Sequence, residues 1–335
     1  MKLGKTNLEV NKIGFGALPI QRRNMDDAVE ILSKAYESGI DFYDTARFYT
    51  DSEAKIGLAF EDVRENIYIA SKTAAETVED FWKDLETSLK EMKTDYIDLY
   101  QHHNISFCPK KDDELAKAME DAKKEGFIKH IGITTHKITL AHEALESGLY
   151  ETLQYPFSYL SNNEELQLVK KCKESNVGFI AMKAMGGGLL NNSKVSYAYL
   201  NQFNNVLPIW GIQHLSELEE FLSYPKDLML DDKLAQIIEK DKKELGENFC
   251  RGCGYCMPCP EGINISLCAR MSLWIRRFPT EPYLTEEYQK IMESTKDCIE
   301  CYACVDKCPY ELDIPELLKE NYEDYENVLN GKVKI

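Results

Sequence analysis

Eight of the chain's eleven cysteines fall in two short runs near the C-terminus. Residues 250–260 read C-x2-C-x2-C-x2-C-P, and residues 298–309 read C-x2-C-x2-C-x3-C-P. A disulfide framework is not expected, because the sequence shows no charged, apolar and small-residue export signal. A single zinc ion fits poorly, because each run brings too many thiols too close together for one tetrahedral site. The runs instead favour iron–sulfur clusters held by thiolates.

The spacing of the second run resembles that of bacterial ferredoxins with two [4Fe–4S] clusters. There the first three cysteines of a run hold one cluster, and the fourth crosses to the other. The resemblance implies two ligand sets, Cys250, Cys253, Cys256 and Cys308 for one cluster and Cys298, Cys301, Cys304 and Cys259 for the other. The first run is one residue shorter before its last cysteine, and zinc stays the alternative. The scattered Cys108, Cys172 and Cys268 are expected to be buried as small apolar side chains.

Length and charge narrow the class of protein further. A chain of 335 residues is long for one core and suggests two domains. The formal net charge of −17 disfavours nucleic acid or an anionic membrane as the main partner. No apolar stretch approaches the roughly eighteen residues that span a bilayer. With reduced thiols and no export signal, we expect a cytoplasmic protein.

Most of the chain alternates short strand-like runs with amphipathic helical stretches. Eight strands are expected at residues 13–16, 41–43, 67–70, 96–100, 128–133, 152–155, 179–182 and 206–210. Between them, apolar residues recur at helical spacing, as in residues 28–35 and 115–122. Eight strand–helix units in about 230 residues predict an α/β fold, the (β/α)8 TIM barrel. A doubly wound sheet is the alternative, but the chain lacks the glycine-rich phosphate loop of that class.

The C-terminal third is expected to form a separate, smaller domain. Residues 231–246 predict a charged linking helix, and the cysteine-rich part begins at Glu247. Residues 316–326 predict a helix that packs back on this part. We therefore expect a barrel over residues 1–230, followed over residues 231–335 by the linking helix and a small, mostly α-helical ferredoxin-like domain.

Four polar residues stand at or just beyond the ends of predicted strands, where barrel enzymes place their chemistry. They are Asp44, Tyr49, Lys72 and His103. Each residue alone is as easily structural as functional, but the four together suit one kind of reaction. A tyrosine phenol has an ordinary pKa of about 10, and a nearby ammonium held by a buried carboxylate is expected to lower that pKa. With a histidine to orient a carbonyl, the set predicts a site that protonates an alkoxide as hydride arrives.

The same residues lie in motifs that resemble the aldo-keto reductase family. The matching segments are residues 3–16, Asp44 to Glu53, Ser71-Lys72, and Asp98 to His103. One position departs from the family's active-site signature, because Thr50 stands where a glycine is usual. The resemblance covers about residues 1–225 and extends to the subset of the family that carries a C-terminal two-cluster domain. It implies an oxidoreductase in which Tyr49 is the general acid and the other three polar residues complete the catalytic set.

The resemblance also implies that NADH or NADPH lies across the mouth of the barrel. The residues expected to contact it are Thr134, Thr135, Gln154, Met182, Lys183, Gly187 and Gly211. Thr135 replaces an asparagine of the family and offers fewer hydrogen bonds. Met182 replaces a tyrosine that stacks on the nicotinamide ring, and methionine holds a ring face loosely. Glu217 stands where members that select NADPH carry a basic residue, so the choice between NADH and NADPH stays open.

Nicotinamide transfers two electrons as hydride, whereas each cluster transfers one, so three functions stay open. In the first, which we favour, the barrel reduces a small carbonyl compound or oxidises an alcohol, and the clusters are structural or redox-sensing. In the second, the clusters exchange single electrons with a ferredoxin-type or flavoprotein partner and feed a substrate or a flavin in the barrel. In the third, the protein is a non-catalytic electron-transfer or sensing module.

Five further side chains are candidates for recognition. Arg47 and Phe48 are expected to line the substrate pocket, because they belong to the loop that carries Tyr49. Arg270, Arg276 and Arg277 stand between the two cysteine runs of an acidic chain, where they form either a docking patch for an acidic partner or an ordinary solvated helix face.

Overall fold

The computed structural model describes residues 1–103, 107–245 and 248–334. Gly246 and Glu247, at the predicted end of the linking helix, lie outside the described residues. The chain divides into two compact units. The first comprises residues 1–184 and 193–230, and the second comprises residues 185–192 and 231–335. Whether these units correspond to the two predicted domains stays a prediction, and the assignment of residues 185–192 to the second unit was not predicted.

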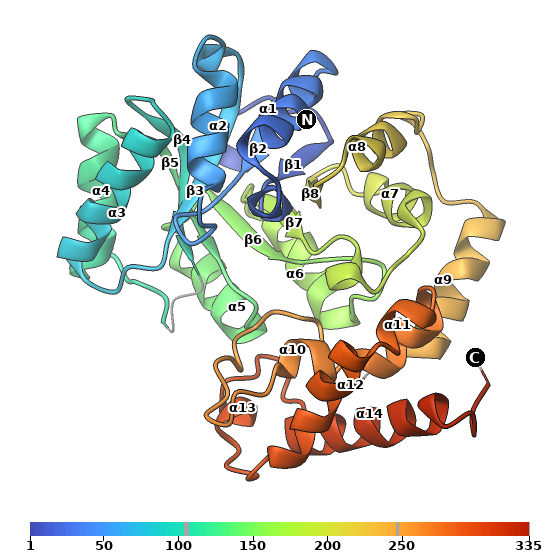
Figure 1. Cartoon of the computed structure of the whole chain (residues 1–335). Coiled ribbons are helices and arrows are strands. Elements are labelled where there is room, and N and C mark those ends of the chain that lie inside the picture. The colour runs from blue at the N-terminus through green and yellow to red at the C-terminus, as the bar shows by residue number, and fades with distance from the viewer. Residues whose placement is uncertain (104–106, 246–247, 335) are drawn as a thin grey trace. The chain divides into compact units, whose positions relative to one another are not determined.

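The first unit is a closed barrel of eight parallel strands in sequence order, with β1 paired to β8 (Figure 1). The strands are β1 (Gly14–Gly16), β2 (Phe42–Asp44), β3 (Tyr68–Thr73), β4 (Ile97–His103), β5 (Ile128–Thr134), β6 (Thr152–Pro156), β7 (Gly178–Met182) and β8 (Val206–Gly211). The predicted (β/α)8 fold is therefore confirmed. Because all strands run in parallel, their carboxyl ends lie at one rim of the barrel.

In the part of the chain that the structure describes, eight α-helices surround the barrel (Figure 1). They are α1 (Met25–Glu37), α2 (Ser52–Phe60), α3 (Val78–Glu91), α4 (Glu114–Glu125), α5 (Ile138–Ser147), α6 (Asn163–Glu174), α7 (Ser193–Asn201) and α8 (Leu215–Leu222). Their ends follow local chemistry. The side chain of Thr77 accepts a hydrogen bond from the Asp80 backbone N–H at 3.1 Å and caps α3. Gly126 ends α4 with a φ of 88°, a conformation that glycine adopts without strain.

The interior of the barrel is apolar at the end opposite the carboxyl rim. Leu3 and Val10, from the segment before β1, are buried there with side chains from the strands, among them Phe42, Leu99 and Leu207. An antiparallel bridge between the second and ninth residues ties this segment into a hairpin-like turn. This apolar plug leaves the opposite rim as the place where polar side chains gather.

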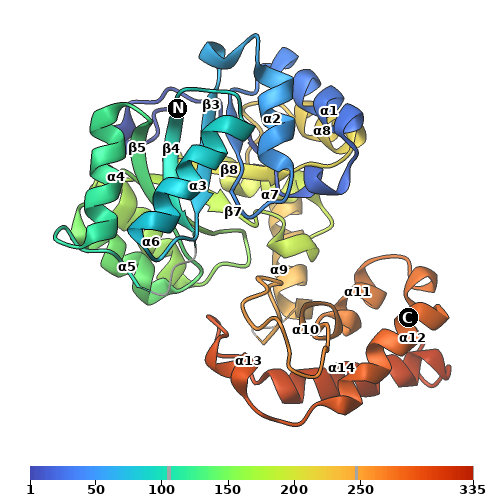
Figure 2. The same cartoon turned by 60° about the vertical axis from the view of Figure 1, so that its left-hand side comes forward.

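The second unit contains only helices and loops among its described residues (Figure 2). Its helices are α9 (Asp232–Leu245), α10 (Ile265–Cys268), α11 (Met271–Arg277), α12 (Glu286–Glu293), α13 (Ala303–Asp306) and α14 (Ile314–Leu329). Buried apolar side chains, including Ile263, Ile275, Met292 and Leu318, form its core. No described helix is long and apolar enough to cross a membrane.

Candidate active site and metal centres

Four polar side chains meet at the carboxyl rim of the barrel. Asp44 is the last residue of β2, Lys72 lies near the end of β3, and His103 is the last residue of β4. Lys72 and Asp44 are buried and joined by a hydrogen bond of 2.7 Å from Nζ to Oδ2. The same ammonium donates to the Thr45 carbonyl at 2.6 Å. The sequence therefore places a buried ion pair between two neighbouring strands.

The electrostatics of this pair keep the positive charge on Lys72. Desolvation alone would lower the pKa of Lys72, but attraction by Asp44 and Tyr49 outweighs it, and the pKa lies above its ordinary value. Burial raises the pKa of Asp44, against the opposing attraction of Lys72. An ammonium held in this way is a fixed positive charge at the rim.

Tyr49, in the loop after β2, lies between this charge and His103. The Lys72 ammonium is 5.1 Å from the centre of the Tyr49 ring, and the rings of Tyr49 and His103 meet edge to face at 5.7 Å. Desolvation raises the pKa of Tyr49 more than Lys72 lowers it, so the predicted net lowering is wrong. The phenol thus keeps its proton at neutral pH, as a proton donor must.

His103 is neutral at physiological pH. Desolvation, and then the charge of Lys72, lowers its pKa to about 3. A neutral imidazole has one nitrogen that donates and one that accepts a hydrogen bond. His103 can therefore orient a substrate oxygen without competing with Tyr49 for the role of acid.

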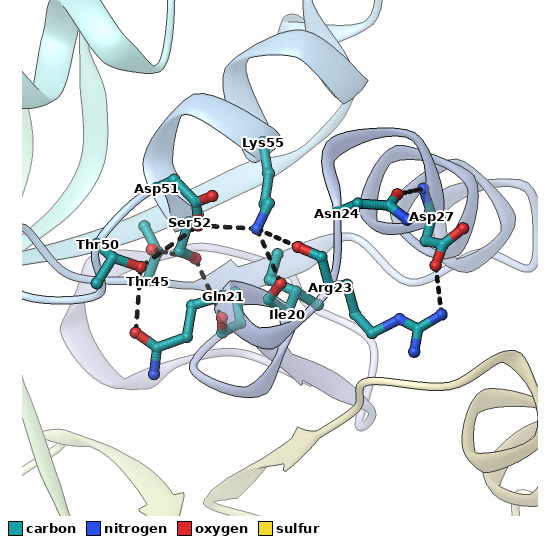
Figure 3. A network of polar contacts seen from close by, with 11 residues as sticks. Ile20, Gln21, Arg23, Asn24, Asp27, Thr45, Thr50, Asp51, Ser52 and Lys55 are labelled. Carbon is teal, nitrogen blue, oxygen red and sulfur yellow. Dashed lines mark hydrogen bonds and ion pairs between the residues drawn. The ribbon is translucent and has the colours of Figure 1, made fainter.

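The loop that carries Tyr49 is anchored at both ends (Figure 3). Thr45 donates to the Ser52 hydroxyl at 2.9 Å, and Ser52 donates to the Ala17 carbonyl at 3.1 Å. Between them, Thr50 has a φ of 42°, which is unusual for a side chain other than glycine. This conformation explains why the related family favours glycine at the position.

Lys55, in the first turns of α2, forms the centre of the second anchor (Figure 3). Its fully buried ammonium donates to the carbonyls of Ile20 and Arg23 at 3.1 and 2.7 Å and to the Asp51 carboxylate at 2.8 Å. These bonds join the loop after β1 to the start of α2. They hold the loop after β1 against the segment that directly follows Tyr49.

The predicted nicotinamide contacts separate into two groups. Thr134, Thr135, Gln154, Met182, Lys183 and Gly211 belong to the barrel unit, whereas Gly187 belongs to the second unit. Thr134 donates to the Met182 sulfur at 3.9 Å. Thr135 accepts from the Lys137 backbone N–H at 3.0 Å, and Gln154 accepts from Gln101 at 2.9 Å. These hydrogen bonds join protein groups to one another, so the role of these residues in coenzyme binding stays a prediction.

His136 is a rim residue that the sequence analysis missed. It directly follows the two candidate threonines after β5 and is buried. Desolvation, and then the positive charges of Lys183 and His103, lowers its pKa well below the ordinary value. This histidine, Lys183 and His103 therefore lie within electrostatic reach of one another. The rule that strand ends carry the chemistry would have selected His136.

Glu217, in the first turn of α8, has a defined structural role. Its carboxylate accepts hydrogen bonds from the backbone N–H groups of Gln213 and His214 at 2.8 and 3.0 Å. It thus occupies donors that a helix start otherwise offers to an anion. The two side chains of the predicted substrate pocket differ, because Arg47 forms an ion pair with Glu53 while Phe48 is 79% exposed.

The thiols of the first predicted cluster lie close together in the second unit. We call the site of Cys250, Cys253, Cys256 and Cys308 the first cluster site. Burial, and then the neighbouring thiols of Cys250 and Cys253, raises the pKa of Cys256 to about 12, and Cys308 acts in the same direction. Cys308 comes from the second run, so a cysteine of that run lies beside the first run.

The second predicted set surrounds a cavity, the second cluster site. The cavity is lined by Cys259, Cys298, Cys301 and Cys304 together with Cys256. No group of three or more ligand-type side chains among the described residues converges as a single metal ion requires. Cysteine thiolates are the ordinary ligands of iron–sulfur clusters, so the residue types that line this cavity fit such a group. Cys108, Cys172 and Cys268 are buried, as expected.

As a set, Arg270, Arg276 and Arg277 form neither of the two expected surfaces, a docking patch or a solvated helix face. Arg270 and Arg277 are buried and donate to backbone carbonyls of the second unit. The exposed Arg276 pairs with Asp324, its Nη2 donating at 2.7 Å. These guanidinium groups donate to acceptors of their own unit. The three positions therefore do not form a free basic surface.

Two family models match the chain. The aldo/keto reductase family matches residues 12–248, and a 4Fe-4S dicluster domain matches residues 249–312. An uncharacterized oxidoreductase of Bacillus subtilis is 26% identical over 253 residues, which are 71% of this chain and 81% of that protein. L-Galactose dehydrogenase of Arabidopsis thaliana is 30% identical over 212 residues, 56% of this chain and 66% of that protein.

Solved structures share the fold. An aldo-keto reductase from Bacillus halodurans has a TM-score of 0.62 at 22% identity and covers 72% of this chain and 95% of its own. One from Klebsiella pneumoniae in complex with NADPH has a TM-score of 0.61 at 19% identity and covers 72% and 93%. The chain therefore belongs to the aldo-keto reductase family of oxidoreductases and carries a C-terminal iron–sulfur domain of the 4Fe-4S dicluster type.

Replacing Lys55 with methionine removes the anchoring ammonium but keeps the length of the side chain. We expect the free energy of unfolding to fall by about 1–3 kcal/mol, because two carbonyl oxygens lose their donor. Urea unfolding measures the loss. The control is Lys34→Met, which removes an ammonium that is 54% exposed and pairs with Glu37, and it should cost less than about 0.5 kcal/mol. Equal losses in both variants would contradict the anchoring role of Lys55.

Proposed function

We propose that the protein reduces a carbonyl group of a small molecule with NADH or NADPH, or oxidises the corresponding alcohol. The observation that carries the proposal is the arrangement of Tyr49 between the buried Lys72–Asp44 pair and His103. The family membership supports an oxidoreductase of this kind. An anionic rim would oppose alkoxide formation, whereas this rim holds a positive charge next to a protonated phenol.

The side chains have separate roles in the proposed reaction. Tyr49 and a neutral His103 donate hydrogen bonds to the carbonyl oxygen and orient it. When bound, the nicotinamide supplies the hydride that converts the carbonyl carbon to an alkoxide. Tyr49 gives its proton to that oxygen, and Lys72 stabilises the phenolate left behind. The proton balance is restored from solvent before the next turnover.

NADH is the coenzyme that the start of α8 favours. The carboxylate of Glu217 caps the backbone N–H groups there. A 2′-phosphate near this helix start would meet that negative charge instead of free donors. The proposal therefore couples the choice of coenzyme to Glu217.

We further propose that the second unit holds two [4Fe–4S] clusters in a reducing, cytoplasmic setting. The ligands of the first would be Cys250, Cys253, Cys256 and Cys308, and those of the second Cys298, Cys301, Cys304 and Cys259. Their support is the proximity of these thiols in two groups, together with the family match. When bound, such clusters supply one-electron transfer, structural cross-linking or both.

One observation favours a second function, in which the clusters exchange single electrons with a ferredoxin-type or flavoprotein partner. The second cluster site is open to solvent, since Cys301 is exposed, Ile299 is 62% exposed and Tyr302 is 48% exposed. Electrons entering there would serve a substrate or a flavin in the barrel. The remaining alternative is a non-catalytic electron-transfer or redox-sensing protein.

Tyr49→Phe removes the proposed acid without changing the shape of the ring. We expect kcat for carbonyl reduction to fall by about 10²–10⁴-fold, while the Kd for NADH stays within about twofold, because the phenol acts in the transition state. Steady-state kinetics with a panel of aldehydes and a fluorescence titration with NADH measure the two quantities. Tyr36→Phe removes a phenol on the outer helix α1 and should leave both unchanged. An undiminished kcat in Tyr49→Phe would refute the proposal.

Glu217→Gln removes the negative charge at the start of α8 but keeps an acceptor for the cap. We expect the ratio of NADPH to NADH affinity to rise about three- to tenfold, because a single charge near a phosphate in water contributes about 1 kcal/mol. The matched control is Glu219→Gln on the exposed side of the same helix. If both variants keep the wild-type ratio, Glu217 does not govern the choice of coenzyme.

A further inference from the structure

The glycine-rich loop of residues 185–192 is held by two buried arginines of the second unit. Arg270 donates from Nη1 to the Gly187 carbonyl at 2.9 Å. Arg277 donates from Nε to the Leu189 carbonyl at 2.7 Å. The loop follows β7 directly and contains a predicted contact of the coenzyme. Its backbone is thus positioned by side chains from the cysteine-rich part of the sequence.

Arg270 lies in an environment that differs from that of an ordinary buried arginine. It is 8% exposed, donates from Nε to the Ser266 carbonyl at 2.7 Å, and has its guanidinium carbon 4.6 Å from the centre of the Trp274 ring. In the described part of the chain, no ion pair joins it to a carboxylate. Burial lowers the pKa of Arg270, and the neighbouring side chains of Cys250 and Cys253, two proposed ligands of the first cluster site, oppose that shift.

The geometry of the first cysteine run gives independent evidence of this proximity. A Cβ added to Gly252 would lie 2.6 Å from Arg270 Nη1 and 2.8 Å from its guanidinium carbon. Gly252 also has a φ of +61°, which side chains rarely adopt. The guanidinium therefore lies directly against the backbone of the run, in space that only a glycine leaves open.

By contrast, the charge of Arg277 is already balanced. Its Nη2 donates to the Asp241 carboxylate at 2.8 Å, and both side chains are less than 9% exposed. Arg277 thus binds the same loop as Arg270, but its charge is paired with a carboxylate. Arg270, by contrast, both holds the loop and lies against the first cysteine run.

We propose that Arg270 is the charge partner of the first cluster site and links the oxidation state of that site to the loop at Gly187. The inference rests on the proposed function, because it requires a cluster on these thiolates. A cluster with four thiolates gains one negative charge when an external low-potential donor reduces it by one electron. The buried guanidinium stabilises that added charge and so raises the reduction potential. The same planar guanidinium lies against the first cysteine run and donates to the Gly187 carbonyl. A stronger attraction to the reduced cluster therefore changes its hydrogen bond to Gly187.

The test compares three charge-removing variants of the full chain, prepared and kept without oxygen. Stepwise reduction with dithionite, followed by electron paramagnetic resonance, gives the midpoint potential of each cluster. We expect Arg270→Gln to lower one midpoint by about 59 mV, equivalent to a tenfold change in the equilibrium constant of a one-electron reduction, and to leave the other unchanged. Arg277→Gln and Arg276→Gln should leave both midpoints at the wild-type values, since their charges are paired with Asp241 and Asp324.

Amide hydrogen exchange supplies the second readout. The N–H groups of Gly188 and Leu190 both donate to the Met185 carbonyl, so their exchange reports on the loop. We expect exchange at least threefold faster in Arg270→Gln and Arg277→Gln, and unchanged in Arg276→Gln. In the wild type, reduction of the clusters should change the exchange rate, and in Arg270→Gln it should not.

The outcomes separate the inference from the proposed function. Wild-type protein without iron and sulfide would overturn the cluster assignment itself. A full complement of both in Arg270→Gln, with unchanged midpoints, would overturn only the role of Arg270. If Arg270→Gln loses its clusters, Arg270→Lys decides, because it keeps the charge but not the planar fork. The inference then requires that Arg270→Lys keep the wild-type midpoint while its loop exchanges faster than in the wild type. A tenfold shift in the reduction equilibrium of Arg270→Lys would overturn the inference.

Discussion

The buried ion pair between Lys72 and Asp44 is the constraint around which the barrel site is built. Taking two charges out of water is costly, and the direct bond and the Thr45 carbonyl offset that cost only while both partners remain. The pair joins β2 to β3 at the rim and holds a positive charge next to Tyr49. The anchors of the neighbouring loop, centred on Ser52 and Lys55, then fix the backbone that presents the phenol.

Much of this arrangement could be predicted from sequence, because a parallel barrel brings all strand ends to one rim. Knowing that Asp44, Lys72 and His103 end or nearly end strands was enough to expect them together. The net pKa shift of Tyr49 was not predictable, since burial depends on how the surrounding loops close. For the same reason His136 was missed, although its position two residues after β5 carried a usable signal.

Less of the cysteine-rich part could be predicted from the sequence. The resemblance of the two runs to those of two-cluster ferredoxins implied which thiols share a cluster, and those ligand sets stay a prediction. It could not indicate that Arg270 and Arg277 turn inward, since neither composition nor charge shows which acceptors lie nearby. The loop after β7 was expected to belong to the barrel, but the carbonyls of Gly187 and Leu189 accept hydrogen bonds from these two arginines. The chain thus combines an aldo-keto reductase barrel with a 4Fe-4S dicluster domain. The loop at Gly187 belongs to the second unit, although it directly follows β7 in the sequence.

The account depends most on the claim that hydride, and not a pair of single electrons, reaches the substrate carbon in the barrel. A single turnover without oxygen, using NADH or NADPH deuterated at the transferable position and a panel of aldehydes, tests this most directly. The account predicts that the alcohol product carries one deuterium on the former carbonyl carbon, in water of natural abundance. An alcohol that takes that hydrogen from solvent, while the nicotinamide label is lost elsewhere, would contradict it.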